Sequence, residues 1–151
     1  MSRIRIVVAD QAEAVFYDSA SLGMPLREVA KITDAAAHLH DRDFCSDRPG
    51  RTHASVGSAR SAYTRETNSR QLEAVRFARR IARRLDDARR KEEYERLIIV
   101  AGPSFLGLMR EELSKPTKAR VVHEVPKDLV HSPVDAVRKH LPEADADIGL
   151  D

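Results

Sequence analysis

A short polar turn contains the side chains best suited to binding an anion. The segment DRPGR begins at Asp47, carries Arg48 and Arg51 on either side of a Pro-Gly pair, and is followed closely by His53. Because proline and glycine favour a tight turn, the two guanidiniums can project toward one point and bind phosphate or carboxylate oxygens in a bidentate manner. The alternative is an arginine–aspartate pair that pins the segment onto the domain, and the pattern favours neither interpretation.

A second concentration of arginine lies between residues 70 and 91. Nine lysines and arginines stand here against three acids, although the whole chain has a formal net charge of only +2 and the residues after Pro142 are acidic. Such a basic segment is typical of a surface that binds a polyanion. An ordinary solvated helix would look the same, since arginine is a good helix former. The candidate binding residues in this segment are Arg76, Arg79, Arg80, Arg83 and Arg84.

The sequence contains no set of residues with the spacing of a catalytic or metal centre. Asp10 follows the first apolar run and could be a metal-binding carboxylate, but its only candidate partners, Asp43 and Asp47, have no spacing that brings them to it. We interpret Asp10 as a turn residue whose carboxylate binds its own backbone. The six histidines are dispersed, and no serine lies in a nucleophile motif. We expect no cofactor, no metal and no catalytic residues, and leave open whether the chain is an enzyme.

Cysteine usage and hydropathy indicate the compartment. Cys45 is the single cysteine, so the chain cannot form an internal disulfide, and it lies among Asp43, Ser46 and Asp47 rather than beside a second sulfur. The apolar run at the N-terminus is too short for a signal peptide, and no later run approaches the length of a membrane span. These features predict a cytoplasmic protein that does not insert into membranes.

The elements that would position these residues begin with strands. Alternating apolar residues at 4–8 and an apolar run at 14–17 predict a hairpin, and a third strand is expected at 26–32. Residues 34–66 show no sustained period and contain several breakers, which predicts a long loop. The chain therefore begins as an antiparallel meander that leads into this loop.

Helices and strands alternate in the second half of the chain. Apolar residues recur on one helical face from Ala74 to Ala88, and Asn68 with Gln71 has the pattern of a capping box, so a helix is expected to begin there. The later elements are expected to be a buried strand at 96–102, a helix from Pro103, a strand at 119–125 and a last helix at 132–141.

Three antiparallel strands followed by an αβαβα alternation predict an α/β fold. This order of elements is that of ribonuclease-H-like three-layer domains, and right-handed crossovers would make the second half of the sheet parallel. We expect one domain at residues 1–141 and an acidic, flexible tail at 142–151, where large apolar groups are few. The order of helices and strands does not by itself determine a function.

Four segments of the chain resemble the bacterial host-attachment protein family. They are DRDFCSDRPGRTHAS at 41–55, AVRFARRIARRL at 74–85, RLIIVAGPSFLGLMR at 96–110 and KDLVH at 127–131. The most specific parts are the SDRPGR turn and the Pro-x-Phe-Leu-Gly-Leu segment, because neither is demanded by helix or strand formation. The resemblance extends over nearly the whole chain from Ile4 to Leu141, and it implies a role in attachment to host cells.

One helix also bears a more distant resemblance to the middle domain of archaeal and eukaryotic peptide-chain release factors. Ala74, Arg76, Phe77 and Arg79 match the release-factor pattern Ser-Ala-x-Arg-Phe-x-Arg, although packing by Phe77 and a salt bridge of Arg76 would explain them as plain structure. Residues 70–72 are Arg-Gln-Leu, where release factors have Gly-Gly-Gln. That loop needs its glycines for backbone freedom, so the resemblance does not carry peptidyl-tRNA hydrolysis to this chain.

The sequence leads to three hypotheses about function. The first is a non-catalytic binding module that engages RNA, as tRNA or on the ribosome, through the arginine-rich helix and the SDRPGR turn. The second, implied by the family resemblance, is a protein required for attachment to host cells that acts indirectly through a protein partner. The third is a divergent nuclease or hydrolase, for which the residues offer no catalytic set.

Overall fold

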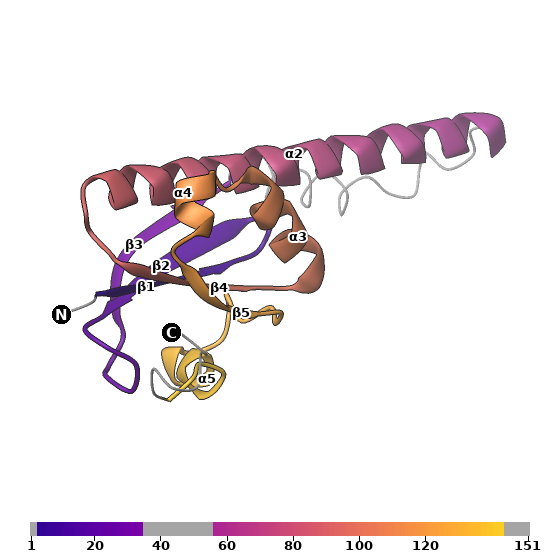
Figure 1. Ribbon diagram of the computed structural model, residues 1–151. Coiled ribbons are helices and arrows are strands. Elements are labelled where there is room, and N and C mark those ends of the chain that lie inside the picture. The colour runs from indigo at the N-terminus through magenta and orange to yellow at the C-terminus, as the bar shows by residue number, and fades with distance from the viewer. Residues whose placement is uncertain (1–2, 35–55, 144–151) are drawn as a thin grey trace.

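The computed structural model describes residues 3–34 and 56–143 of the chain. In this part an opening run of three strands is followed by alternating helices and strands (Figure 1). The elements are β1 (Ile4–Ala9), β2 (Glu13–Ser19), β3 (Arg27–Thr33), α2 (Val56–Arg90), β4 (Arg96–Ala101), α3 (Pro103–Glu112), α4 (Lys115–Lys118), β5 (Val121–Val125) and α5 (Val134–Lys139).

The strands of the described part form one mixed, five-stranded sheet in the order β3-β2-β1-β4-β5. β1 is antiparallel to β2 and β2 to β3, whereas β1 and β4, like β4 and β5, run parallel. The opening meander and the parallel second half predicted from the sequence are therefore both confirmed. β1 and β4 lie inside the sheet and are covered on both faces, which explains why they are nearly continuous apolar runs.

Helices cover both faces of the sheet, so the domain has three layers (Figure 1). α2, α3 and α4 lie on one face, where Val7, Phe77 and Ile81 belong to the larger core. α5 lies on the other face, where Val137 belongs to a second core with Ile6. Successive residues of a strand point to opposite faces, which is why Ile6 and Val7 of β1 belong to different cores.

α2 is longer than the sequence pattern predicted. It begins at Val56 rather than at Asn68, so Asn68 lies inside the helix, and residues 56–66, which were expected in a loop, are helical. Figure 1 shows that the first turns of α2 extend beyond the sheet. A helical segment that extends beyond the sheet needs no apolar face directed toward it, so its sequence lacks the period that would have revealed it. The rest of the predicted loop, residues 35–55, lies outside the described residues.

A short helix that the sequence did not predict precedes β5. The side chain of Ser114 caps α4 by accepting a hydrogen bond from the backbone N–H of Thr117, and Pro116 is tolerated because the first turn of a helix has unpaired N–H groups. Because of α4, β5 begins at Val121 rather than at residue 119, and α5 then occupies the middle of the predicted 132–141 helix.

None of the helices in the described ranges combines the length and the apolar character that crossing a membrane requires. α2 has 35 residues, but charged side chains interrupt it along most of its length. A bilayer needs about 20 consecutive, mostly apolar residues, and α3 has only 10.

Candidate functional site

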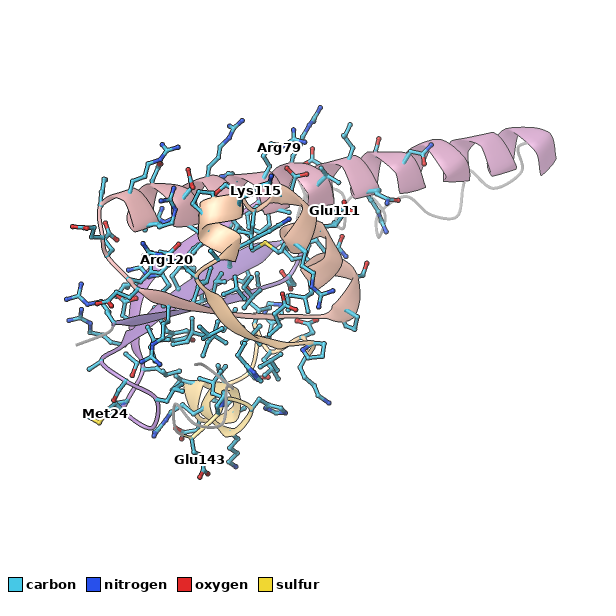
Figure 2. The ribbon with its side chains drawn as sticks, viewed as in Figure 1. Met24, Arg79, Glu111, Lys115, Arg120 and Glu143 are labelled. Atoms are coloured by element: carbon cyan, nitrogen blue, oxygen red, sulfur yellow. The ribbon has the colours of Figure 1, made fainter. Side chains whose placement is uncertain are left out.

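α2 presents several arginines on the part of its surface that is not packed into the core. Ile81 and Leu85, on the opposite side of the helix, are fully buried in the larger core. Side chains of α2 project from the helix into solvent above the sheet (Figure 2). This division confirms the amphipathic helix predicted from the sequence. We call the five exposed arginines that the sequence marked as candidate binding residues the arginine face: Arg76, Arg79, Arg80, Arg83 and Arg84.

Two members of the arginine face have carboxylate partners. Nε of Arg79 lies 3.0 Å from Oε1 of Glu112 on α3, and Nη1 of Arg76 lies 3.7 Å from Oε1 of Glu73, one turn earlier. Ion pairs this exposed stabilise a fold by only about 0–1 kcal/mol, but each carboxylate offsets the charge that its arginine could offer to an anion. Arg76 thus makes the salt bridge suggested as its structural role, and Phe77 beside it is buried.

Two further members lie over buried aromatic rings. The guanidinium carbon of Arg80 is 5.7 Å from the ring centroid of Phe77, and that of Arg84 is 5.5 Å from the ring centroid of Phe16. Arg80 also donates a 3.0 Å hydrogen bond to the backbone carbonyl of Thr33 at the end of β3. Cation–π contacts at exposed sites contribute about 0.5–1 kcal/mol. They orient a guanidinium without neutralising its charge.

Arg83 is the fifth member of the arginine face. Its side chain is exposed, and no residue in the described part of the chain forms a hydrogen bond or an ion pair with its guanidinium. Residues three and four apart in a helix are neighbours on its surface, so Arg80 lies beside both Arg83 and Arg84. We call Arg80, Arg83 and Arg84 the uncompensated triad, because none of them has a carboxylate partner among the described residues.

The polar turn that was predicted to join the arginine face lies outside the described residues. This applies to Asp47, Arg48, Arg51 and His53, and equally to Cys45. The structure therefore brings together the helical half of the predicted site. That the SDRPGR turn lies beside it stays a prediction.

A polar network that the sequence did not predict bounds the arginine face at the C-terminal end of α2. Oδ1 of Asp86 accepts hydrogen bonds from Arg89 at 2.8 Å and from the hydroxyls of Ser114 at 2.8 Å and Thr117 at 3.1 Å. Its other oxygen, Oδ2, lies 2.8 Å from Nη2 of Arg90. The network joins α2 to α4 and partly neutralises two arginines that composition alone would have added to the basic surface.

These donors lower the pKa of Asp86 from 3.8 to about 2, and the hydrogen bond from Arg89 is the largest cause, followed by that from Ser114. A carboxylate whose pKa is lower in the folded than in the unfolded chain stabilises the fold at pH values above the unfolded pKa. This contribution is therefore complete above about pH 4 and is lost as the pH falls from about 4 to about 2.

We predict that Asp86→Asn lowers the free energy of unfolding by about 1–2 kcal/mol near neutral pH, a value reduced for partial solvent screening. Urea unfolding of the variant and the wild type checks this at neutral pH and again at about pH 2.5. The two stabilities should converge in acid, where the wild-type carboxylate begins to protonate. A difference that stays constant with pH would show that the charge of Asp86 is not what matters.

Asp10 lies in the turn between β1 and β2. Its Oδ1 accepts hydrogen bonds from the backbone N–H groups of Ala12 and Glu13, both at 2.8 Å, which confirms the interpretation of Asp10 as a turn residue. Its Oδ2 lies 3.5 Å from Nε2 of His131, whose Nδ1 lies 3.1 Å from Oε1 of Glu13. Within residues 3–34 and 56–143, no group of three or more histidines, cysteines and acids is arranged to hold a metal ion.

The fold and the site together define a mixed α/β domain whose helix α2 carries an arginine face. The family model described as "Protein required for attachment to host cells" matches residues 5–141, and the chain belongs to this family. The chain is also 28% identical over 136 residues to an uncharacterized protein of Rickettsia prowazekii (strain Madrid E), and the match covers 89% of each chain. The family predicted from the sequence segments is confirmed.

Proposed function

We propose that this chain is a non-catalytic, cytoplasmic binding module that engages RNA through the arginine face of α2. The observation that carries the proposal is the uncompensated triad of Arg80, Arg83 and Arg84. Arginines on either side of it, such as Arg79 and Arg90, are paired with carboxylates. Unpaired positive charge held on one helix turn is available to an external anion.

The geometry of the triad suits the phosphates of a nucleic acid strand. Arg80 and Arg84 are separated by roughly 6 Å along the helix axis, a distance at which they can contact neighbouring phosphates. The rings of Phe77 and Phe16 orient both guanidiniums before binding, so little side-chain freedom is lost when they bind. Planar guanidiniums can also stack on the unpaired bases of a single-stranded RNA, which favours RNA over an acidic protein as the partner.

The strand order supports a more specific fold class, and the release-factor resemblance supports a more specific kind of RNA. The strand order β3-β2-β1-β4-β5, with its first three strands antiparallel, is the order expected for a ribonuclease-H-like fold. The segment at 74–79 resembles release factors, which act on tRNA in the ribosome, so we infer that tRNA or ribosomal RNA is the ligand. The SDRPGR turn, with Arg48 and Arg51, would add phosphate contacts beside those of α2.

The family description favours a second candidate function. A protein required for attachment to host cells could act indirectly, through a protein partner that presents an acidic surface to the same three arginines. This candidate differs from the first in the chemistry of the partner. The residues that bind it would be the same.

Crosslinking in cells distinguishes the two candidates. The full chain would be irradiated in its bacterial cytoplasm and purified under denaturing conditions, and both the attached molecules and the crosslinked peptide would be identified. We expect tRNA or ribosomal RNA attached within residues 76–84. Recovery of RNA no higher than that of a control protein, with a protein crosslinked to the same peptide instead, would replace the first candidate by the second.

A further inference from the structure

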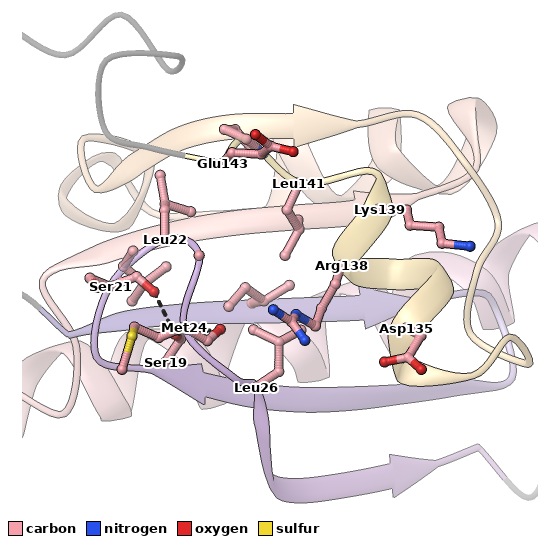
Figure 3. A pocket seen from close by; sticks show the side chains of 14 residues that line it. Ser19, Ser21, Leu22, Met24, Leu26, Asp135, Arg138, Lys139, Leu141 and Glu143 are labelled. Atoms are coloured by element: carbon pink, nitrogen blue, oxygen red, sulfur yellow. Dashed lines mark hydrogen bonds between the residues drawn. The ribbon is translucent and has the colours of Figure 1, made fainter.

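A cavity lies on the face of the sheet opposite the helix that carries the arginine face. It is a cavity of about 600 Å³ between α5 and the turn that joins β2 to β3 (Figure 3). Its floor is formed by Ile4 and Ile6 of β1, and Leu22, Leu26 and Leu141 add apolar walls. Pockets of this size are typical of small-molecule sites, and this one combines apolar side chains with two serines and four charged residues.

At one end of the cavity, the backbone of the β2–β3 turn lies close to the backbone of the segment that follows α5. Gly23 has a φ of +85° in the turn, and a Cβ placed on it would lie 3.1 Å from the carbonyl oxygen of Glu143. Only glycine fits both this conformation and this approach without strain. The turn and the chain that follows α5 therefore meet, so the cavity is already formed without a ligand.

One cation reaches into the cavity. Arg138 of α5 lines it, and Figure 3 shows its guanidinium near Leu26, whereas Lys139 points away. None of the residues that the structure describes forms a hydrogen bond or an ion pair with the guanidinium of Arg138. A guanidinium beside apolar side chains matches a ligand with an anionic head and an apolar body.

Acidic side chains at the rim of the cavity limit how much negative charge the head group of a ligand can carry. Asp135 and Glu143 also line the cavity, so the two basic and two acidic side chains around it nearly cancel. One inward guanidinium can bind one carboxylate in a bidentate manner, but a doubly charged phosphate would meet the repulsion of both acids. We propose that this cavity binds an amphipathic monocarboxylate, with its head on Arg138 and its hydrocarbon body against the partly exposed side chains of Leu22, Leu26 and Leu141. The site is separate from the proposed RNA surface.

Titration of the isotope-labelled full chain with octanoate, followed by methyl NMR, tests this site. Shifts should concentrate on Leu22, Leu26 and Leu141 and saturate, whereas octylamine, with the same chain and the opposite charge, should produce none of them. Octyl phosphate, at a pH where it is doubly charged, should bind more weakly than octanoate. Shifts scattered over the surface, or octylamine binding as well as octanoate, would overturn the proposal.

Two variants on one helix separate the head-group contact from general charge. Arg138→Gln should weaken octanoate binding about tenfold, the effect of removing a hydrogen-bonded ion pair, whereas the matched change Lys139→Gln should leave it nearly unchanged. Both residues are exposed, so neither change should unfold the protein. Equal affinities of the two variants would show that Arg138 does not bind the head group.

Discussion

Replacing Asp18 by alanine is expected to lower the free energy of unfolding by about 3 kcal/mol. Asp18 of β2 and Arg5 of β1 face each other across the sheet, joined by two hydrogen bonds of 2.7 and 2.9 Å. Their side chains are only 10% and 8% exposed. Alanine would leave the buried guanidinium with Glu93, at 3.3 Å, as its remaining carboxylate partner among the described residues. A buried charge that loses its partner costs more than the pair contributes.

Urea unfolding followed by circular dichroism measures this decrease. Glu112→Ala is the matched control, because it breaks the exposed pair with Arg79 and should cost less than about 1 kcal/mol. The double variant Arg5→Met with Asp18→Leu removes both charges and should recover most of the stability. If Asp18→Ala costs no more than Glu112→Ala, the buried pair does not stabilise the sheet as its geometry indicates.

Replacing Arg80, Arg83 and Arg84 together by glutamine is expected to weaken RNA binding on the order of 100-fold near physiological salt. When an arginine neutralises a phosphate, a counterion bound to the RNA is released, whereas an uncharged glutamine displaces no counterion. The free energy of unfolding should fall by only about 1 kcal/mol, because the variant lacks the cation–π interactions. Affinity would be measured by fluorescence anisotropy with a short single-stranded RNA, and stability by urea unfolding of the same samples.

A second triple variant controls for net charge. Arg76, Arg79 and Arg110 are each paired with a carboxylate, the last with Glu124. Changing these three to glutamine removes the same formal charge but leaves the uncompensated triad intact. The decrease in affinity should then be several times smaller. Equal decreases for the two variants would mean that overall charge, rather than the triad, determines binding.

The outward position of the arginine face could be predicted because it follows from local sequence. Apolar residues at three- and four-residue steps place Ile81 and Leu85 on one side of a helix, and the arginines between them must then face solvent. Which arginines are neutralised could not be predicted. Glu112 lies on α3 and Ser114 just before α4, so their contacts with α2 depend on tertiary packing.

The buried pair was missed for a similar reason. Arg5 alternates with Ile4 and Ile6, a pattern that suggests a strand with one face in water. In the structure α2 covers the face that carries Arg5, and the register of β1 and β2 supplies Asp18 opposite it. A single polar residue in an apolar strand does not reveal its partner, because the partner is set by strand register.

The salt dependence of RNA binding tests the central claim most directly. Affinities of the wild-type chain and of the Arg80, Arg83 and Arg84 triple glutamine variant would be measured for one RNA at salt concentrations from about 50 to about 200 mM. If the triad binds phosphates, the slope of log affinity against log salt should become shallower by about one for each arginine–phosphate pair that the variant cannot form. Equal affinities with parallel slopes would contradict the account and leave the arginine face as a solvated helix surface.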